Sequence, residues 1–380
     1  MTETSSMSIT GAAADVLPHI RELLAAVPIR LGHQPTPGSV VTIGIASVDA
    51  DEPMLVASTS AELIGGEQGE AVGRSVVAHL VAMGCEWVAL AGYPDASVPG
   101  VEVVRRLCFA AGIRDAGVRQ VGAGQVVQKP QGVQFPTTAL ADTRIARRAA
   151  MDGRAPVRCR ADLGCIPAVG HVDRRAAAEG RLRWSASRVA EFGHLPVDMP
   201  VWGEWQRRSL RRWRRALADP EAVTRSSLGR IEAGLDDHAV VEAAALTLIA
   251  PEAPEDDDVL ARLTTAALDM PMGHPEGSDV IAVRPWLALL LTPGIAPPDP
   301  EPAHRAVRLL HRVVSHGRLS RQAGALTILA LLAWCRGEGV LASVWAERAR
   351  VMDPDQPLAA QLDWLLAAGA VPGWVRIAPA

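Results

Sequence analysis

Ser39-Val-Val-Thr-Ile-Gly-Ile45 and Glu86-Trp-Val-Ala-Leu-Ala91 are the two runs that decide the fold class of the N-terminal part of the chain, and the helix-length segment Ala71–Met83 separates them. Apolar and β-branched runs of this length are typical of buried strands. Met54–Ser58 follows the first run across an acidic turn, so we expect these two segments to pair. Strands that alternate with helices in this way predict a small sheet with flanking helices.

The segments on either side continue this alternation. Asp15–Ala26 has the apolar spacing of an amphipathic helix, and Pro28 is expected to end it. Val101–Ala111 has the pattern of another helix, and Ala116–Val127 predicts a further strand or hairpin. We therefore expect an α/β domain over residues 1–130.

The apolar periodicity weakens over residues 131–200, where prolines interrupt short segments. One helix is expected there, at Leu140–Met151. We interpret residues 131–200 as an irregular connector that packs against the first domain.

Residues 201–380 are predicted to be almost entirely helical, because helix-length segments follow one another with short Pro, Gly and Asp punctuation. The expected helices are Gly203–Leu217, Val223–Ala233, His238–Ile249, Asp257–Ala267, Pro302–Ser315, Gln322–Cys335, Val340–Met352 and Leu358–Ala368. Such short connections indicate stacked helical hairpins. The expected fold class is thus an α/β N-terminal domain followed by an all-α C-terminal domain of stacked helical hairpins.

The helix Gly203–Leu217 concentrates positive charge. Its arginines are Arg207, Arg208, Arg211, Arg212, Arg214 and Arg215. At about 100° per residue they occupy an arc of about 160°. The opposite side comprises Trp202, Trp205, Leu210, Trp213 and Leu217. The helix therefore has an arginine face and a tryptophan face.

These two faces leave several interpretations open. The tryptophans can bury in the helical domain while the arginines pair with acidic neighbours such as the run Glu252–Asp258. The arginines can instead bind phosphate, with tryptophans stacked on nucleic-acid bases, or they can bind a protein partner. A basic face opposite Trp and Leu also occurs in interfacial membrane helices, but we expect no membrane association.

The loop after the first predicted helix contains the candidates for a small-molecule site. His33 and Ser39 lie there with Gly32 and Pro35, and they offer an imidazole, a hydroxyl and backbone N–H groups to a polar ligand. The alternative is that the glycine and prolines only shape the connection.

No sequence motif predicts catalysis, a metal or a cofactor. Cys159, Cys165 and His171 could supply three zinc ligands and Asp173 a fourth, but the cysteines are spaced more widely than in a typical zinc site. The glycine-rich segments lack the full dinucleotide pattern, and Lys129 has no phosphate-binding loop before it. We therefore assign no catalytic residue, metal ligand or cofactor.

The overall composition is globular, with 49% hydrophobic and 21% charged residues. The formal net charge of -4 argues against general attraction to nucleic acid, so any such binding must be local. Of the 38 basic residues all but Lys129 are arginines, so arginine richness alone does not indicate phosphate binding. Five scattered cysteines, no visible secretory signal and apolar runs too short to span a membrane lead us to expect a cytoplasmic protein.

Three stretches of the chain carry a family resemblance. They are Ala25–Val41, with its Leu31-Gly-His33 and Ser39; Gly234–Leu246; and Leu331–Trp374, with Gly337-Glu-Gly339, Trp345-Ala-Glu and Asp353-Pro354. Together they resemble an actinobacterial family known as domain of unknown function 4192. Within the last stretch, small residues where two helices approach and a proline after the second helix resemble a tetratricopeptide unit. The resemblance implies no activity or site residue.

These features favour a protein that binds a partner over an enzyme. We expect an interaction or regulatory protein that binds a protein or peptide through its helical domain. Two alternatives stay open. One is a nucleic-acid-binding protein that uses the Arg207–Arg215 helix, and the other is a small-molecule-binding or enzymatic α/β domain with its site beside His33 and Ser39.

Overall fold

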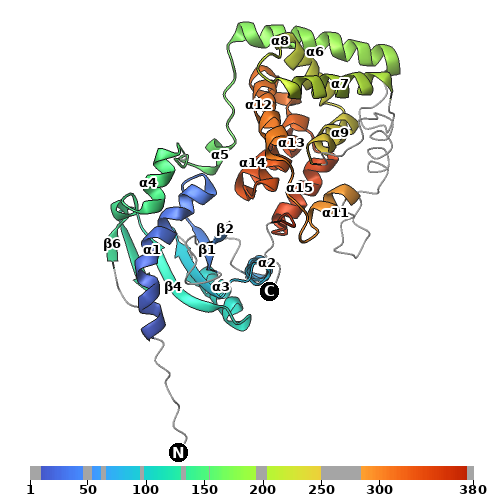
Figure 1. Cartoon of the computed structure of the whole chain (residues 1–380). Coiled ribbons are helices and arrows are strands. Elements are labelled where there is room, and N and C mark those ends of the chain that lie inside the picture. The colour runs from blue at the N-terminus through green and yellow to red at the C-terminus, as the bar shows by residue number, and fades with distance from the viewer. Residues whose placement is uncertain are drawn as a thin grey trace, which may run out of the picture. The chain divides into compact units, whose positions relative to one another are not determined.

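The chain divides into two units, Met1–Leu163 with Pro379–Ala380, and Gly164–Ala378. The structure is a computed structural model, and it describes residues 10–45, 54–60, 66–94, 98–129, 134–153, 155–193, 203–249 and 284–374. The first unit contains a sheet with helices, and the described part of the second is helical (Figure 1). The predicted fold class is therefore confirmed.

The α/β unit is built on a six-stranded sheet in the order β2-β1-β3-β4-β5-β6. The strands are β1 (Ser39–Ile45), β2 (Met54–Ser60), β3 (Trp87–Gly92), β4 (Arg114–Val121), β5 (Gln125–Lys129) and β6 (Gln134–Pro136). Neighbouring strands are antiparallel except β3 and β4, which are parallel and are joined through helix α3 (Val98–Ala110). β1 and β3 are buried along their whole length, which is why their sequences consist mostly of apolar and β-branched residues.

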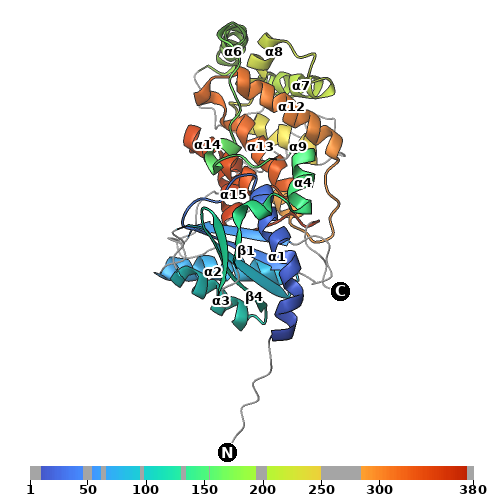
Figure 2. The same cartoon turned by 90° about the vertical axis from the view of Figure 1, so that its left-hand side faces the viewer.

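Helices lie on both faces of this sheet. α1 (Thr10–Leu31) and α4 (Arg144–Met151) lie on one side, and α2 (Gly66–Ala82) and α3 lie on the other (Figure 1, Figure 2). The helices and strands bury apolar side chains such as Leu24, Leu90 and Val104 between them. This layering is what the alternation of strands and helices predicted.

The expectation that Pro28 ends the first helix is wrong. α1 continues to Leu31, and Gly32 follows it with a φ of 76°. Val27 and Leu31 are both buried, so the apolar face of the helix extends past the proline. Packing of this last turn outweighs the hydrogen bond that the proline nitrogen cannot donate.

The helical unit contains most of the predicted helices. They are α7 (Glu204–Ala218), α8 (Arg225–Gly234), α9 (His238–Ile249), α12 (Pro300–His316), α13 (Ala323–Cys335), α14 (Gly339–Met352) and α15 (Pro357–Ala367). Each begins and ends within about two residues of its predicted bounds, which is the usual scatter of helix ends. A short helix, α11 (Pro285–Leu290), was not predicted. The predicted helix Asp257–Ala267 and the acidic run Glu252–Asp258 lie outside the described residues.

The interpretation of residues 131–200 as one irregular connector is wrong. The described part contains β6, α4, the short helix α5 (Arg160–Leu163) and α6 (His171–Phe192), a helix of 22 residues. The division between the units falls after Leu163, and α6 packs against α8 in the helical unit. Apolar periodicity missed α6 because its inward face carries arginine and tryptophan in place of an apolar stripe.

A single hydrophobic cluster forms the core of the helical unit. α13 lies at its centre, and nearly every residue of this helix is buried. Its sequence is apolar on all sides, as expected for a helix surrounded by others. α7 contributes Trp205, Leu210 and Trp213 to the same cluster.

Candidate functional site

The tryptophan face of α7 packs into the core of the helical unit. Trp205 and Trp213 are 0% and 1% exposed. The Trp213 Nε1–H donates to Thr247 Oγ1 at 3.2 Å, and the Trp205 Nε1–H donates to the Trp184 carbonyl at 3.1 Å. These two rings are therefore buried anchors, as the first of the alternative interpretations predicted. Trp202 lies outside the described residues.

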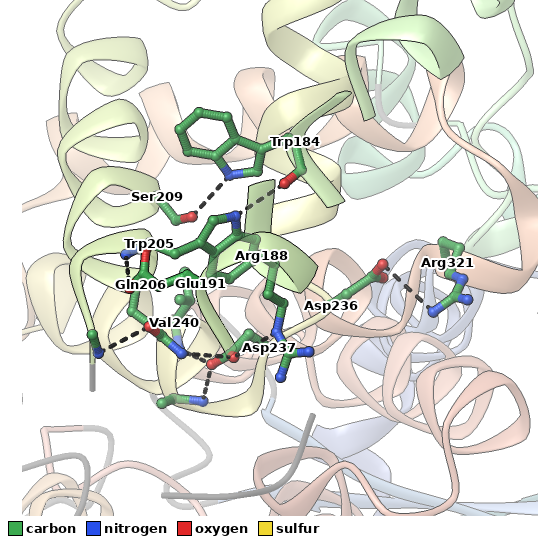
Figure 3. Close-up of polar contacts among 12 residues, drawn as sticks. Trp184, Arg188, Glu191, Trp205, Gln206, Ser209, Asp236, Asp237, Val240 and Arg321 are labelled. Carbon is green, nitrogen blue, oxygen red and sulfur yellow. Dashed lines mark hydrogen bonds and ion pairs between the residues drawn. The ribbon is translucent and has the colours of Figure 1, made fainter. Parts of the chain in front are cut away.

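Polar contacts fasten α7 to α6 (Figure 3). The Trp184 Nε1–H of α6 donates to Ser209 Oγ of α7 at 3.0 Å. At the end of α6, one oxygen of Glu191 accepts a hydrogen bond from the Trp205 backbone N–H at 2.9 Å, and the other is 3.3 Å from Arg208. The Glu191 carboxylate lies at the positive end of α7, where a negative charge stabilises the helix.

The arginine face of α7 is only partly exposed. Arg208 pairs with Glu191, and Arg211 lies 2.5 Å from Glu204. Arg212 stacks on the ring of Trp184, with its guanidinium carbon 4.5 Å from the ring centroid. Arg207 and Arg214 are half-buried and each has an interaction partner, whereas Arg215 is exposed.

Three of these arginines, Arg208, Arg212 and Arg215, gather with Arg230 of α8 into what we call the arginine cluster. Burial lowers the pKa of Arg212, and the charges of Arg230, Arg215 and Arg208 lower it further. Within the described residues, Glu191 is the only carboxylate in an ion pair with any of the four. The Nε atoms of Arg208 and Arg212 are buried without a hydrogen-bond partner. The arginine cluster thus holds an excess of positive charge.

A second polar group lies at the turn between α8 and α9, which sequence reasoning missed. On α6, Arg181 lies 3.7 Å from Glu232, and Arg188 lies 3.8 Å from Asp237. Both carboxylates are buried. Arg321, in the short helix η3 (Leu319–Arg321), lies 3.6 Å from Asp236. Figure 3 shows the ion pair of Asp236 with Arg321 and that of Asp237 with Arg188. Acidic residues inside an otherwise apolar segment were the signal available in the sequence.

Asp237 connects three of these elements. Its Oδ1 accepts hydrogen bonds from the backbone N–H groups of Ala239 and Val240 at 3.1 and 3.3 Å, which caps α9. Its Oδ2 accepts from Gln206 Nε2 of α7 at 3.2 Å and faces Arg188 of α6. Burial raises the pKa of Asp237 to about 6. This arrangement holds helices together, and we assign it a structural role.

Stability is expected to fall between about pH 5 and about pH 8, partly because of Glu232. Burial raises the pKa of Glu232 from its ordinary 4.5 to about 7, although the N–H of Arg318 and the charge of Arg181 act in the opposite direction. A raised carboxyl pKa means that the folded protein holds the proton more tightly. The stabilisation that comes from protonated Glu232 is therefore complete below the pKa that Glu232 has in the unfolded chain. It is lost as the pH rises through the folded-state pKa of about 7. Glu232→Gln should remove about 1–3 kcal/mol of this pH dependence in denaturant titrations.

The matched control for this prediction is Glu179→Gln on α6. The Glu179 side chain is 56% exposed and pairs with Arg175 one turn away. Its variant should keep the pH dependence of the unmodified protein. If Glu232→Gln and Glu179→Gln give the same curve, Glu232 does not gain its proton on folding.

Another buried ion pair joins Glu242 of α9 to Arg284, next to α11. The two side chains are 0% and 1% exposed, and the Trp286 Nε1–H donates to Glu242 Oε2 at 3.0 Å. Burial raises the pKa of Glu242 to about 7. The Arg284 backbone N–H donates to Gln361 of α15 at 3.3 Å, so the pair links three helices.

His33 and Ser39, the candidate ligand residues, each find a partner within their own loop. His33 Nδ1 lies 2.7 Å from the Gln34 carbonyl oxygen, and Ser39 Oγ donates to the Thr36 carbonyl at 2.7 Å. Both residues are buried. These contacts are those of a shaped connection, and the ligand-binding role of the two residues stays a prediction.

No metal site is found in the part of the chain that the structure describes, where no three His, Cys, Asp or Glu side chains are placed to hold an ion. None of the described helices is long and apolar enough to cross a membrane.

The fold and the two polar groups define a protein with an α/β unit and a helical unit whose layer of α6, α7 and α8 is rich in arginine. Residues 295–373, which include α12 to α15, match the model of a family described as "Domain of unknown function (DUF4192)". This match supports the family resemblance for the C-terminal part of the chain. No curated protein and no solved structure is detectably similar to the chain.

Proposed function

We propose that the chain is a binding protein whose helical unit docks an acidic segment of a protein partner on the face formed by α6, α7 and α8. The observation that carries this proposal is the arginine cluster, in which four guanidinium groups are accompanied by one paired carboxylate among the described residues. Like charges held together destabilise the unbound protein, and an acidic segment would supply the missing negative charge.

The environment of the tryptophans favours a protein partner over nucleic acid. Nucleic-acid bases bind single-strand proteins by stacking on exposed aromatic rings. Trp205 and Trp213 are buried in the core, and one face of Trp184 is covered by Arg212. The net charge of -4 also provides no general attraction to a polyanion.

The C-terminal hairpin is further support for an interaction protein. α13 and α14 are joined by a short turn at Gly337, whose φ is 75°. Ala342, Ala346 and Ala349 are fully buried on α14. Small residues of this kind let helices approach closely, as in tetratricopeptide stacks, which typically present binding surfaces. The enzymatic alternative has less support, since His33 and Ser39 are occupied by contacts within their loop.

Charge reversal of the arginine cluster is expected to weaken partner binding. Arg215→Glu/Arg230→Glu and the unmodified protein would be used to capture partners from the native host, with proteins and nucleic acid analysed in the same eluate. A candidate partner would then be purified and its affinity measured at several salt concentrations. We expect a protein with an acidic segment, whose affinity falls with salt and falls about ten-fold or more in the variant.

The control for this experiment is Arg174→Glu/Arg175→Glu, which changes the net charge equally. These residues lie on α6, about 14–15 Å along the helix from Trp184. The control should keep the partner. Equal loss in both variants, or unchanged binding in Arg215→Glu/Arg230→Glu, contradicts the proposal, and direct salt-sensitive binding of nucleic acid alone would favour the nucleic-acid alternative.

A further inference from the structure

We infer that the arginine cluster is a binding site for a phosphoryl group, a tetrahedral oxyanion that carries up to two negative charges. The inference rests on the proposed function in that it assigns a ligand chemistry to the same face. The site differs from the one expected from sequence, which consisted of six arginines on one helix. Three helices contribute instead: α7 with Arg208, Arg212 and Arg215, α8 with Arg230, and α6 with Trp184.

Trp184 is the platform of this site. The guanidinium groups of Arg212 and Arg208 lie over its ring, at 4.5 and 5.5 Å from the ring centroid. The ring is itself fixed, because its Nε1–H donates to Ser209 Oγ at 3.0 Å and its neighbour Trp205 is 6.2 Å away, centroid to centroid. A cation over the face of an aromatic ring is attracted to it, which holds the guanidinium groups at this position.

The charge balance of the cluster fits a doubly charged ligand. Among the described residues, one carboxylate is in an ion pair with the four arginines, that of Glu191, which also accepts a hydrogen bond from the Trp205 backbone N–H. One further carboxylate would leave most of the excess charge in place, whereas a phosphoryl dianion would offset more of it. Guanidinium groups also match the geometry of phosphate oxygens, to which they donate two parallel hydrogen bonds.

The other arginines of the same layer show that this excess is specific to the cluster. Arg181 and Arg188 of α6 each lie within 4 Å of a buried carboxylate, and Arg225 of α8 lies 2.7 Å from Asp173. These three arginines hold helices together, and each is paired with a carboxylate. Arg212 differs from them because, within the described residues, it has no carboxylate in an ion pair, and the charges that act on it are those of three arginines. An arginine without a paired carboxylate, in a layer where neighbouring arginines have one, is the kind of local exception that is typical of functional sites.

Titration of the full chain with inorganic phosphate tests this inference directly. Binding would be followed by calorimetry, with sodium chloride added to the protein and phosphate solutions so that the ionic strength stays constant. We expect saturable binding that weakens about ten-fold or more in Arg212→Gln and in Arg230→Gln, because each variant loses a charged hydrogen-bond donor. Two variants are needed because Arg212→Gln also removes the stack on Trp184, and circular dichroism would show that both remain folded.

Arg225→Gln is the matched control, since Arg225 is on α8 like Arg230 but pairs with Asp173. It should bind phosphate as the unmodified protein does. Absence of saturable binding, or an equal effect of all three variants, overturns the inference.

A pair of acidic peptides that differ only in a phosphoserine would identify the source of the phosphoryl group. Tighter binding of the phosphorylated peptide, lost in Arg212→Gln, supports a phosphorylated partner. Equal binding of both peptides together with cluster-dependent phosphate binding supports a free phosphate ligand. Binding of the acidic peptides without any phosphate binding overturns this inference and leaves the proposed function standing. Phosphate binding that depends on the arginine cluster, found without any protein partner, supports this inference and contradicts the proposed function.

Discussion

Replacing Gly229 by alanine is expected to lower the free energy of unfolding by about 3 kcal/mol or more. Gly229 lies within α8, where this helix crosses α6. A Cβ atom at this position would lie 1.8 Å from the carbonyl oxygen of Ala177 and 2.6 Å from its carbonyl carbon. Both are backbone atoms of α6, so no side chain can rotate away and the two helices have to separate. Urea denaturation followed by circular dichroism would measure the loss.

Gly339 provides the matched control for this substitution. It is the first residue of α14, and an added Cβ would meet nothing within 4 Å. Gly339→Ala is therefore expected to be neutral or to stabilise by up to about 1 kcal/mol, as alanine generally does in helices. Gly180→Ala should resemble Gly229→Ala, because its Cβ would lie 2.1 Å from the Ser226 carbonyl oxygen at the same crossing. An unchanged denaturation midpoint for Gly229→Ala would contradict the close approach of α6 and α8.

The crossing of α6 and α8 also bears on the candidate site. α6 carries Trp184 and α8 carries Arg230, so the distance between the two helices sets the distance between the platform and one of the guanidinium groups. Glycine at the contact lets the helices approach more closely than any side chain would permit. Gly180 and Gly229 therefore stabilise the helical unit and also position the arginine cluster.

The elements that could be predicted from sequence are those whose burial follows a simple period. β1 is buried on both faces, so Ser39–Ile45 is mostly apolar or β-branched, and its bounds agree with the prediction. α9 is buried nearly all round and was also predicted with its observed bounds, His238–Ile249. α6 was missed because it is held by Arg181, Trp184 and Arg188 rather than by an apolar stripe.

The candidate site could be predicted only in part, for a related reason. The six arginines of α7 were visible because they are close together in the chain. The arginine cluster contains only some of these six, because its other members, Trp184 and Arg230, come from other helices. The approach of Trp184 and Arg230 depends on the contact between Gly180 and α8. The periodicity of one helix carries no information about which helix lies next to it. The buried carboxylates Glu232 and Asp237 were missed for the same reason, since their partners are on α6.

Trp213→Ala is expected to lower the free energy of unfolding by about 3–5 kcal/mol. Trp213 is 1% exposed in the core cluster, so truncation leaves a large cavity and frees Thr247 Oγ1 from its hydrogen bond with the indole. Arg215→Ala, on the opposite side of the same helix, is expected to change the stability by at most about 0.5 kcal/mol, because Arg215 is exposed. Denaturant titration of both variants would give the two values.

The difference between these two substitutions tests the orientation of α7 and, with it, the placement of the arginine cluster. If the tryptophan face anchors the helix, the arginine face must point away from the core, toward Trp184 and Arg230. Similar costs for Trp213→Ala and Arg215→Ala would contradict this orientation. A large cost for Trp213→Ala together with a negligible one for Arg215→Ala would show that Arg215 contributes little to the fold. Its charge, which acts on Arg212, would then call for a ligand as its explanation, since an uncompensated group of like charges is otherwise unfavourable.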